Sequence, residues 1–332
     1  MIYHGNLLEK WSLKMDFIND LEFFMKKEMQ RAQANPSNTR SILYQYFNMQ
    51  KRLIAVRPRK VVYSQEFQCP EEYKCALSEF ENDVRAGKNL NKYQSDKIRR
   101  PEITDDLLND WNIVHFHLSR RFRNDGFAKR SDYQIFTWIT DTCVYMIQIY
   151  HHRENFLYCK QEFLKIVEKN WPELLEAHRL KEVTSLAEQF DDEQYEKIRE
   201  AHATTFVQLG ENRVYGLLGG GYMSDGSSGE AVRNADYWHN RMKLCEELIR
   251  MHMSFISQVI QEQRDYNGYT YHIKLLGLPE SSDKIRTLEV ETQMGIELLL
   301  SERRMRVFKM EEELEYNWDM ICHYGIWNNQ FV

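Results

Sequence analysis

The stretch "DWNIVHFHLSRRFRNDGFAKRSDYQIFTWITDTCVYMIQIYHH", residues 110–152, holds four of the chain's eleven histidines together with a group of arginines. Its apolar residues are rich in β-branched and aromatic types and are interrupted by turn residues. This pattern predicts three consecutive strands over 112–118, 133–140 and 143–151. The histidines and arginines therefore either form a site or lie on the solvated face of a sheet.

Strand periodicity separates the residues of the first strand into two sets, because residues two apart share a face. Val114, Phe116 and Leu118 are predicted to face the core, and His115 and His117 are predicted to lie side by side on the opposite face. On the last strand the side chains alternate in the same way. At most one member of the adjacent pair His151 and His152 can therefore join the histidine face.

Basic residues flank the histidine strands. Between residues 57 and 160 the chain has 17 Lys and Arg against 15 Asp and Glu, whereas its overall net charge is −6. The positive charge is therefore concentrated in this part of the chain, in a group that contains Arg120, Arg121, Arg123, Lys129 and Arg130.

Three interpretations follow from a cluster of histidines and arginines on a sheet. Imidazoles can act as general base and acid when a phosphodiester is cleaved through the ribose 2′-hydroxyl, while arginine stabilises the charge on phosphorus. His115 and His117 can instead bind a metal with a third ligand from a neighbouring strand. In the third interpretation, exposed strand positions simply tolerate histidine and the arginines are a solvated loop.

The whole-chain properties set the context of these alternatives. A chain of 332 residues that is 42% hydrophobic can bury a substantial core and predicts two or three compact units. We expect a cytoplasmic location and no membrane partner, because no signal-peptide pattern and no long apolar run is found. The six cysteines include no C-x-x-C pair, so we expect reduced thiols.

Helices and strands are predicted on both sides of the histidine strands. Before them we expect helices over 6–33 and 38–55, a strand over 60–67 and a helix over 70–90. After them we expect helices over 160–169, 172–190 and 193–202, a hairpin over 204–218 and a helix of about 35 residues after a glycine-rich loop. The tail predicts a strand at 269–277, a hairpin formed by 285–300 and 303–309, and a short acidic helix near 310–319.

The glycine-rich loop, LLGGGYMSDGSSGEAVRNADYW at 217–238, resembles a phosphate cradle, because glycines free backbone N–H groups before a helix N-terminus. It lacks the endings of both common nucleotide-binding motifs. We therefore favour a turn capped by Ser227 or Ser228, and keep weak anion binding by Gly219, Gly220, Gly221 and these serines as the alternative.

The order of elements across residues 57–158 resembles the RelE/ParE superfamily of small bacterial toxins, whose members close with an arginine, two strands and a terminal His or Tyr. The segment from Arg130 through "SDYQIFTWITDTCVYMIQIYHHRENF" is similar to that ending. The RelE branch cleaves messenger RNA on the ribosome without a metal, and ParE members poison gyrase. The resemblance implies that Arg130 stabilises phosphate and that His151 or His152 matches the terminal histidine, whereas His115 and His117 have weaker counterparts.

The fold class expected from this resemblance is α+β. A RelE-like antiparallel sheet with a helical hairpin is expected over 57–158, between an N-terminal helical arm at 1–56 and a C-terminal α+β region at 159–332. The expected function is a toxin or effector in phage defence that acts on RNA or the translation machinery, as an endoribonuclease without metal or cofactor. Possible partners are RNA, the ribosome, and an antitoxin or regulatory protein. The alternative is a non-catalytic module that binds a partner or nucleic acid through the sheet face or the glycine-rich loop.

Overall fold

A computed structural model describes residues 11–309. Its contacts group the chain into two units, one formed by residues 34–40 and 47–233 and the other by the described parts of 1–33, 41–46 and 234–332. Helices α2 (Ile42–Arg52) and α8 (Gly229–Met251) contribute residues to both units. The second unit is made of separated parts of the chain, because residues 12–14 join residues 270–309 in one sheet.

The histidine strands belong to a four-stranded sheet in the unit of residues 47–233. Its strands are β2 (Lys60–Tyr63), β3 (Val114–His117), β4 (Tyr133–Ile139) and β5 (Cys143–His151), in the order β2-β5-β4-β3. The three strands predicted from the opening stretch are confirmed, and they pair antiparallel. The expected RelE-like antiparallel sheet is antiparallel only in these three strands, since β2 runs parallel to β5 and makes the sheet mixed.

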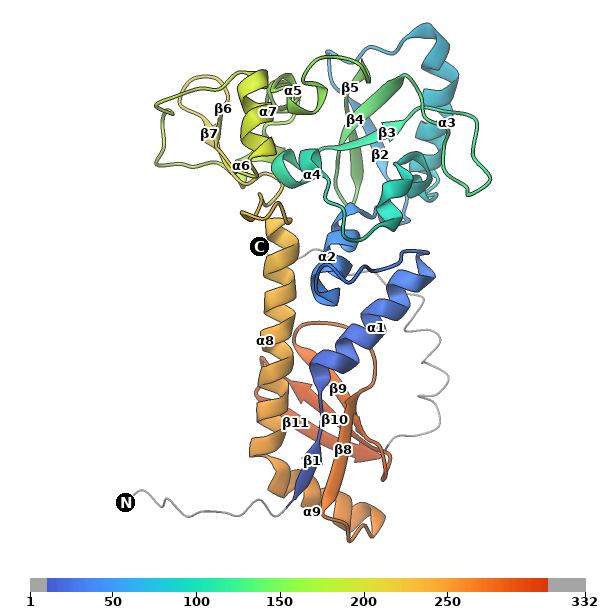
Figure 1. Cartoon of the computed structure of the whole chain (residues 1–332), viewed down its shortest axis with the longest axis vertical. Coiled ribbons are helices and arrows are strands. Elements are labelled where there is room, and N and C mark those ends of the chain that lie inside the picture. Colours follow the sequence, from blue (N-terminus) through green and yellow to red (C-terminus); the bar gives the residue numbers. More distant parts are fainter. Residues whose placement is uncertain (1–10, 310–332) are drawn as a thin grey trace. The chain divides into compact units, whose positions relative to one another are not determined.

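Both faces of this sheet are covered, as Figure 1 shows with α3 on one side and α5 to α7 on the other. Phe116 and Leu118 pack with helix α3 (Lys74–Arg85) in one apolar cluster. Ile113, Phe136 and Trp138 lie in a second cluster with α5 (Glu162–Asn170). The expected open histidine face is therefore packed as well, because long apolar side chains on β4 and β5 project from both faces.

The connections of this unit are mostly short helices. Between β2 and β3 the chain forms η1 (Glu71–Tyr73), α3, η2 (Leu90–Tyr93), η3 (Asp96–Arg99) and α4 (Asp106–Trp111). After β5 come η4 (Leu157–Cys159), α5, α6 (Glu173–Glu176) and α7 (Asp192–Glu200). The helix predicted over 172–190 was too long, since α6 ends at Glu176. The predicted hairpin is confirmed by the antiparallel pair β6 (Val207–Gln208) and β7 (Val214–Tyr215).

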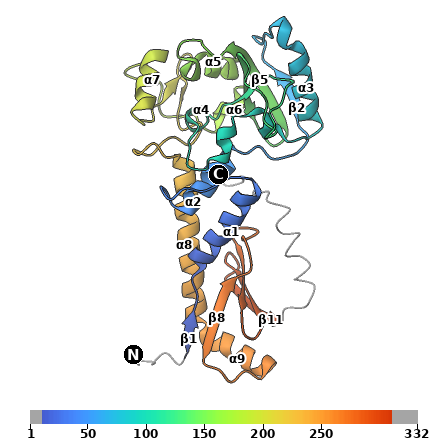
Figure 2. The same cartoon turned by 45° about the vertical axis from the view of Figure 1, so that its right-hand side comes forward.

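The other unit contains a five-stranded sheet in the order β1-β8-β9-β10-β11. Its strands are β1 (Ser12–Lys14), β8 (Thr270–Leu275), β9 (Lys284–Glu289), β10 (Met294–Leu299) and β11 (Arg304–Lys309). β1 runs parallel to β8, and the other pairs are antiparallel. The turned view in Figure 2 shows β1 beside β8.

Three predictions for this unit need correction. The first helix, α1 (Phe17–Arg31), begins after a strand, because Asp16 caps it by accepting a hydrogen bond from the Asn19 N–H. The long helix after the glycine-rich loop is divided at His252 into α8 and α9 (Met253–Arg264). The segment 285–300 is two strands with a turn. Residues 6–10 of the first predicted helix and the acidic helix near 310–319 lie outside the described residues.

None of the helices within residues 11–309 is long and apolar enough to cross a membrane.

Candidate functional site

Strand pairing brings His117, His151 and His152 to one end of the four-stranded sheet, while His115 pairs with Phe136 in the middle of β4. His117 at the end of β3 pairs with Gln134 at the start of β4, and Tyr133 pairs with His151 at the end of β5. The backbone N–H of His152 then donates to the Asp132 carbonyl at 2.7 Å. Residues separated by about thirty-five positions in sequence therefore meet at this end of the sheet because antiparallel strands reverse direction.

His115 and His117 are held in an apolar environment on the side of β3 that faces α5. The His115 ring lies 5.3 Å from the Tyr158 ring and 6.0 Å from the Phe136 ring. Burial lowers the pKa of His115, and the same cause, with a further contribution from the positive charge of Arg130, lowers the pKa of His117 to about 4. Both imidazoles are therefore neutral at physiological pH.

The two buried imidazoles also carry unused hydrogen-bonding capacity. His117 is only 8% exposed, and its Nδ1 atom, like that of His115, has no hydrogen-bond partner among the described residues. Buried polar atoms are usually paired, so unpaired ones in a native protein call for an explanation. Proton exchange with a bound molecule is one such explanation.

Arg130 and His152 are the exposed members of this group. Arg130 adjoins Ser131, whose hydroxyl oxygen accepts the Leu118 N–H at 3.0 Å, and the His152 N–H donates to the Asp132 carbonyl at 2.7 Å. Four residues selected from the sequence, His115, His117, Arg130 and His152, therefore share one neighbourhood. His151 adjoins it but packs its ring edgewise on Tyr133, with centroids 5.1 Å apart.

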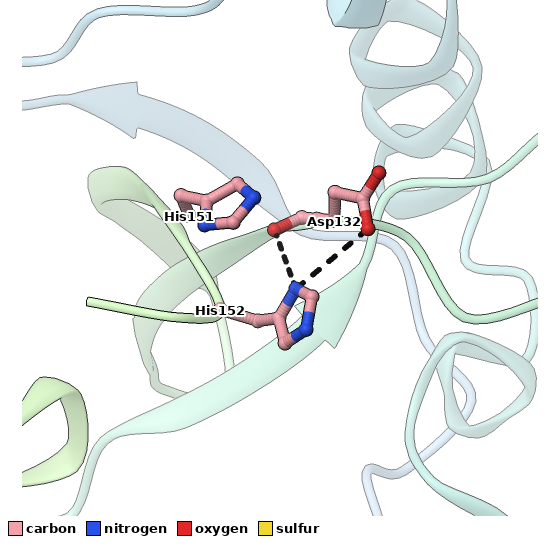
Figure 3. Close-up of side chains that lie close together, drawn as sticks. All are labelled: Asp132, His151 and His152. Atoms are coloured by element: carbon pink, nitrogen blue, oxygen red, sulfur yellow. Dashed lines mark hydrogen bonds and ion pairs between the residues drawn. The ribbon is translucent and has the colours of Figure 1, made fainter. Parts of the chain in front are cut away.

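His152 makes polar contacts with Asp132, a residue that sequence reasoning missed. The Nδ1 atom of His152 lies 3.0 Å from the Asp132 carbonyl oxygen and 3.8 Å from its Oδ1 atom (Figure 3). Within residues 11–309, Asp132, His151 and His152 are the side chains close enough together to share a metal ion. His115 and His117, the metal ligands considered from sequence, do not belong to that group.

The basic residues of the 119–130 loop fall into two classes. Arg120 pairs with Glu79, and Arg123 pairs with both Asp96 and Asp125. Arg121 and Lys129 are exposed, and neither side chain has an ion-pair partner in the described part of the chain. Arg121, Lys129 and the likewise exposed Arg130 are therefore available to an anionic ligand without first breaking an ion pair within the described residues.

An exposed aromatic ring accompanies these cations. Phe122 is 38% exposed, and its ring lies 5.0 Å from the Lys92 ammonium and 5.7 Å from the Tyr93 ring. Phe122 was missed from sequence, although its position within the arginine run is the alternation of charge and aromatic side chain that single-stranded nucleic acid favours.

Tyr158 is a third residue that sequence reasoning missed, after Asp132 and Phe122. Its hydroxyl donates to Gln134 Oε1 at 2.8 Å, which holds the ring over His115. Its carbonyl accepts a hydrogen bond from Arg199 of α7. No pattern in the sequence indicates this residue, because η4 brings it onto the sheet only after folding.

Arg199 forms a buried ion pair with Asp110 next to the histidine strands. Its Nη2 atom donates to Asp110 Oδ2 at 2.7 Å and its Nε atom donates to the same oxygen at 3.2 Å. The guanidinium also lies 4.8 Å from the Trp111 ring. Asp110 lies in the last turn of α4, just before β3, and Arg199 donates to the Tyr158 carbonyl. This pair therefore connects the start of β3 to the segment that covers it.

The glycine-rich loop uses its backbone donors internally. The N–H groups of Gly219 and Gly221 donate to the carbonyls of Asp110 and Asn109, and that of Gly220 donates to Leu217. The Ser227 N–H donates to the Asp225 carboxylate at 3.0 Å. A phosphate would have to displace these bonds, so the contacts favour the structural turn over anion binding.

The same loop packs closely on α4. A Cβ atom at Gly219 would lie 2.0 Å from the Leu108 carbonyl oxygen, so only glycine permits this approach. Lys51 is buried there, pairs with Glu230 at 3.1 Å and donates to the Gly219 carbonyl. Burial lowers the pKa of Lys51, although Glu230 opposes this. The loop is therefore part of the support of α4.

Compared with protein-family models, with curated proteins and with solved structures, the chain has no match.

Proposed function

We propose that this protein is a RelE-like bacterial effector that binds RNA and cleaves it through the ribose 2′-hydroxyl, without a metal ion. The observation that carries the proposal is the group at the end of the sheet. It consists of the nearly buried His117 at the end of β3, with the exposed Arg130 and His152 beside the paired ends of β4 and β5.

In this mechanism His117 accepts the proton of the 2′-hydroxyl. A general base must be unprotonated, and burial keeps His117 in that form at neutral pH. The negative phosphodiester raises the proton affinity of a nearby imidazole, which brings the base closer to the working pH once RNA is bound. Arg130 stabilises the additional charge that develops on the phosphoryl oxygens.

The other imidazoles have supporting roles in the proposal. His152 is exposed and delivers the proton to the departing 5′ oxygen. His151 packs against Tyr133 and holds the end of β5 in place. His115 packs between the rings of Tyr158 and Phe136, two residues before His117 on β3, and helps to position it.

RNA binding is assigned to the loop that precedes β4. Arg121 and Lys129 offer unpaired positive charge to the backbone, and Phe122 offers a ring on which a base can stack. Arg120 and Arg123, already paired with carboxylates, contribute less.

The test compares RNA with the matching DNA oligonucleotide, each with and without ribosomes and in the presence of EDTA. Arg130→Ala should lower turnover more than substrate affinity, because a group that serves the developing charge acts mainly in the transition state. Arg250→Ala, which changes an exposed arginine on α8, is the matched control and should keep full activity.

A non-catalytic RNA-binding module is the second candidate. The packing of both sheet faces favours it, because His115 lies under Tyr158 and Phe136 and His117 is nearly buried. RNA binding that depends on Arg121 and Lys129, with no cleavage under any of the conditions above, would select this candidate.

A further inference from the structure

We propose that Asp132, His151 and His152 bind a divalent transition-metal ion of the zinc type. These side chains offer two imidazole nitrogens and a carboxylate oxygen, and the ligand atoms all lie within 4.8 Å of one another. Figure 3 shows the three side chains grouped at the end of the strands. In a tetrahedral zinc site with bonds of about 2.0–2.1 Å, neighbouring ligand atoms lie about 3.3 Å apart. Modest side-chain rotations therefore suffice to close the site.

The backbone holds the three residues together independently of any metal. Tyr133 pairs with His151 across β4 and β5, and the His152 N–H donates to the Asp132 carbonyl at 2.7 Å. The ligands therefore lie at or beside the paired ends of β4 and β5, so the backbone is already ordered when an ion binds.

The hydrogen bonds also indicate which atoms would bind. His151 Nδ1 accepts the backbone N–H of Arg153 at 3.2 Å, which leaves Nε2 as its ligand atom. His152 Nδ1 lies 3.8 Å from Asp132 Oδ1, close to the separation of two ligands on one zinc ion. If His152 Nδ1 binds the ion, its contact with the Asp132 carbonyl oxygen is lost. That oxygen still accepts the backbone N–H of His152.

The donor set determines the class of ion. Imidazole nitrogens suit zinc, cobalt, nickel and copper, whereas magnesium and calcium prefer all-oxygen sites. Three protein ligands leave a fourth position for water or an anion. The metal alternative considered from the sequence used the His-x-His pair of β3. The structure gathers a different set, because the turn before β4 brings Asp132 to the His-His pair.

The proposal that the three side chains bind a metal does not depend on the proposed function. The expected effect of the metal on RNA cleavage does rest on that function. An ion at this site engages the imidazole of His152, so zinc is expected to inhibit RNA cleavage. Binding and inhibition are measured separately, and the failure of one is therefore distinguishable from the failure of the other.

The experiment titrates the chelator-treated, dialysed full chain with Zn²⁺ by calorimetry and with Co²⁺ by visible absorption, without RNA. We expect one ion per chain and a cobalt spectrum typical of nitrogen and oxygen ligands. His151→Ala and His152→Ala should each weaken binding by about tenfold or more. Asp132→Asn should also weaken it, because the amide cannot supply the negative charge.

His252→Ala is the control, since His252 is exposed and lies at the break between α8 and α9. It should bind the ion as the unchanged protein does, and circular dichroism should show that every variant is folded. The proposal is overturned if the unchanged chain binds neither ion, if the double variant His151→Ala, His152→Ala binds as tightly as the unchanged chain, or if Mg²⁺ competes as well as Zn²⁺.

Discussion

Replacing Arg199 by methionine tests whether the buried ion pair supports the site. The change removes both hydrogen bonds from Arg199 to Asp110 Oδ2, at 2.7 and 3.2 Å, and leaves the carboxylate buried without its cation. Removing one member of a buried ion pair costs about 3–5 kcal/mol. We therefore expect Arg199→Met to lower the free energy of unfolding by this amount, a large share of the total stability of a typical domain.

The loss of unfolding free energy caused by Arg199→Met should become smaller as the pH falls. Burial raises the pKa of Asp110, and the charge of Arg199 opposes that rise. Without Arg199 the pKa of Asp110 rises further, so the folded variant takes up a proton more readily than the unfolded chain. The loss of stability is then largest above the raised pKa and shrinks as the pH falls through it, because protonation removes the buried charge.

Urea denaturation of full chains at pH 5 and pH 8 measures this. Lys197→Ala on the same helix breaks an exposed pair with Glu193 at 2.7 Å and should cost less than about 1 kcal/mol. The double variant Asp110→Leu, Arg199→Met should recover most of the stability, because it leaves no buried charge unpaired. The reasoning is refuted if Arg199→Met costs no more than Lys197→Ala, or if its deficit grows on acidification.

Two further predictions concern the basic loop and the glycine-rich loop. Arg121→Ala and Lys129→Ala should each reduce the slope of log affinity for single-stranded RNA against log salt concentration by about 0.7. Arg123→Ala should change this slope less, because Asp96 and Asp125 already neutralise that arginine. Fluorescence anisotropy over a series of salt concentrations measures the slope. Gly219→Ala should lower the free energy of unfolding by about 3 kcal/mol, because its Cβ would lie 2.0 Å from a carbonyl oxygen. Gly126→Ala, at a φ of +85° in open space, should lower it by about 1 kcal/mol. Chemical denaturation measures both values, and equal losses would contradict the packing argument.

The sequence predicts the histidine strands well, because their pattern is local. Alternation of apolar and polar residues and the Asp141-Thr142 turn determine β3, β4 and β5 to within two residues at each end. The parallel pairing of β1 with β8 could not be predicted in this way, since it joins residues about 258 positions apart and leaves no local signal.

The candidate site was predicted in part for the same reason. His115, His117, Arg130 and His152 lie on or beside strands whose pairing follows from the pattern, so their common neighbourhood could be anticipated. Tyr158 reaches the site from a turn after β5, and its place over His115 depends on a hydrogen bond to Gln134. Contacts of this kind depend on tertiary packing, which periodicity does not describe.

The sequence does contain a signal that both faces of the four-stranded sheet are covered. β4 contains Phe136 and Trp138 at alternating positions, and β5 contains Ile147, so large apolar side chains occupy the face that also carries the histidines. A strand with apolar residues on both faces is typical of a sheet packed on both sides. This packing is what lowers the pKa values of His115 and His117.

The most direct test of the central claim is the rate of cleavage of a single-stranded RNA oligonucleotide in EDTA, with and without ribosomes, by the unchanged chain, Arg130→Ala, His117→Ala and Arg250→Ala. The account predicts cleavage of RNA but not of the 2′-deoxy substrate, a marked loss of turnover in the Arg130 and His117 variants, and full activity in the Arg250 variant. Cleavage of DNA, strict dependence on a divalent ion, or full activity of Arg130→Ala would contradict it.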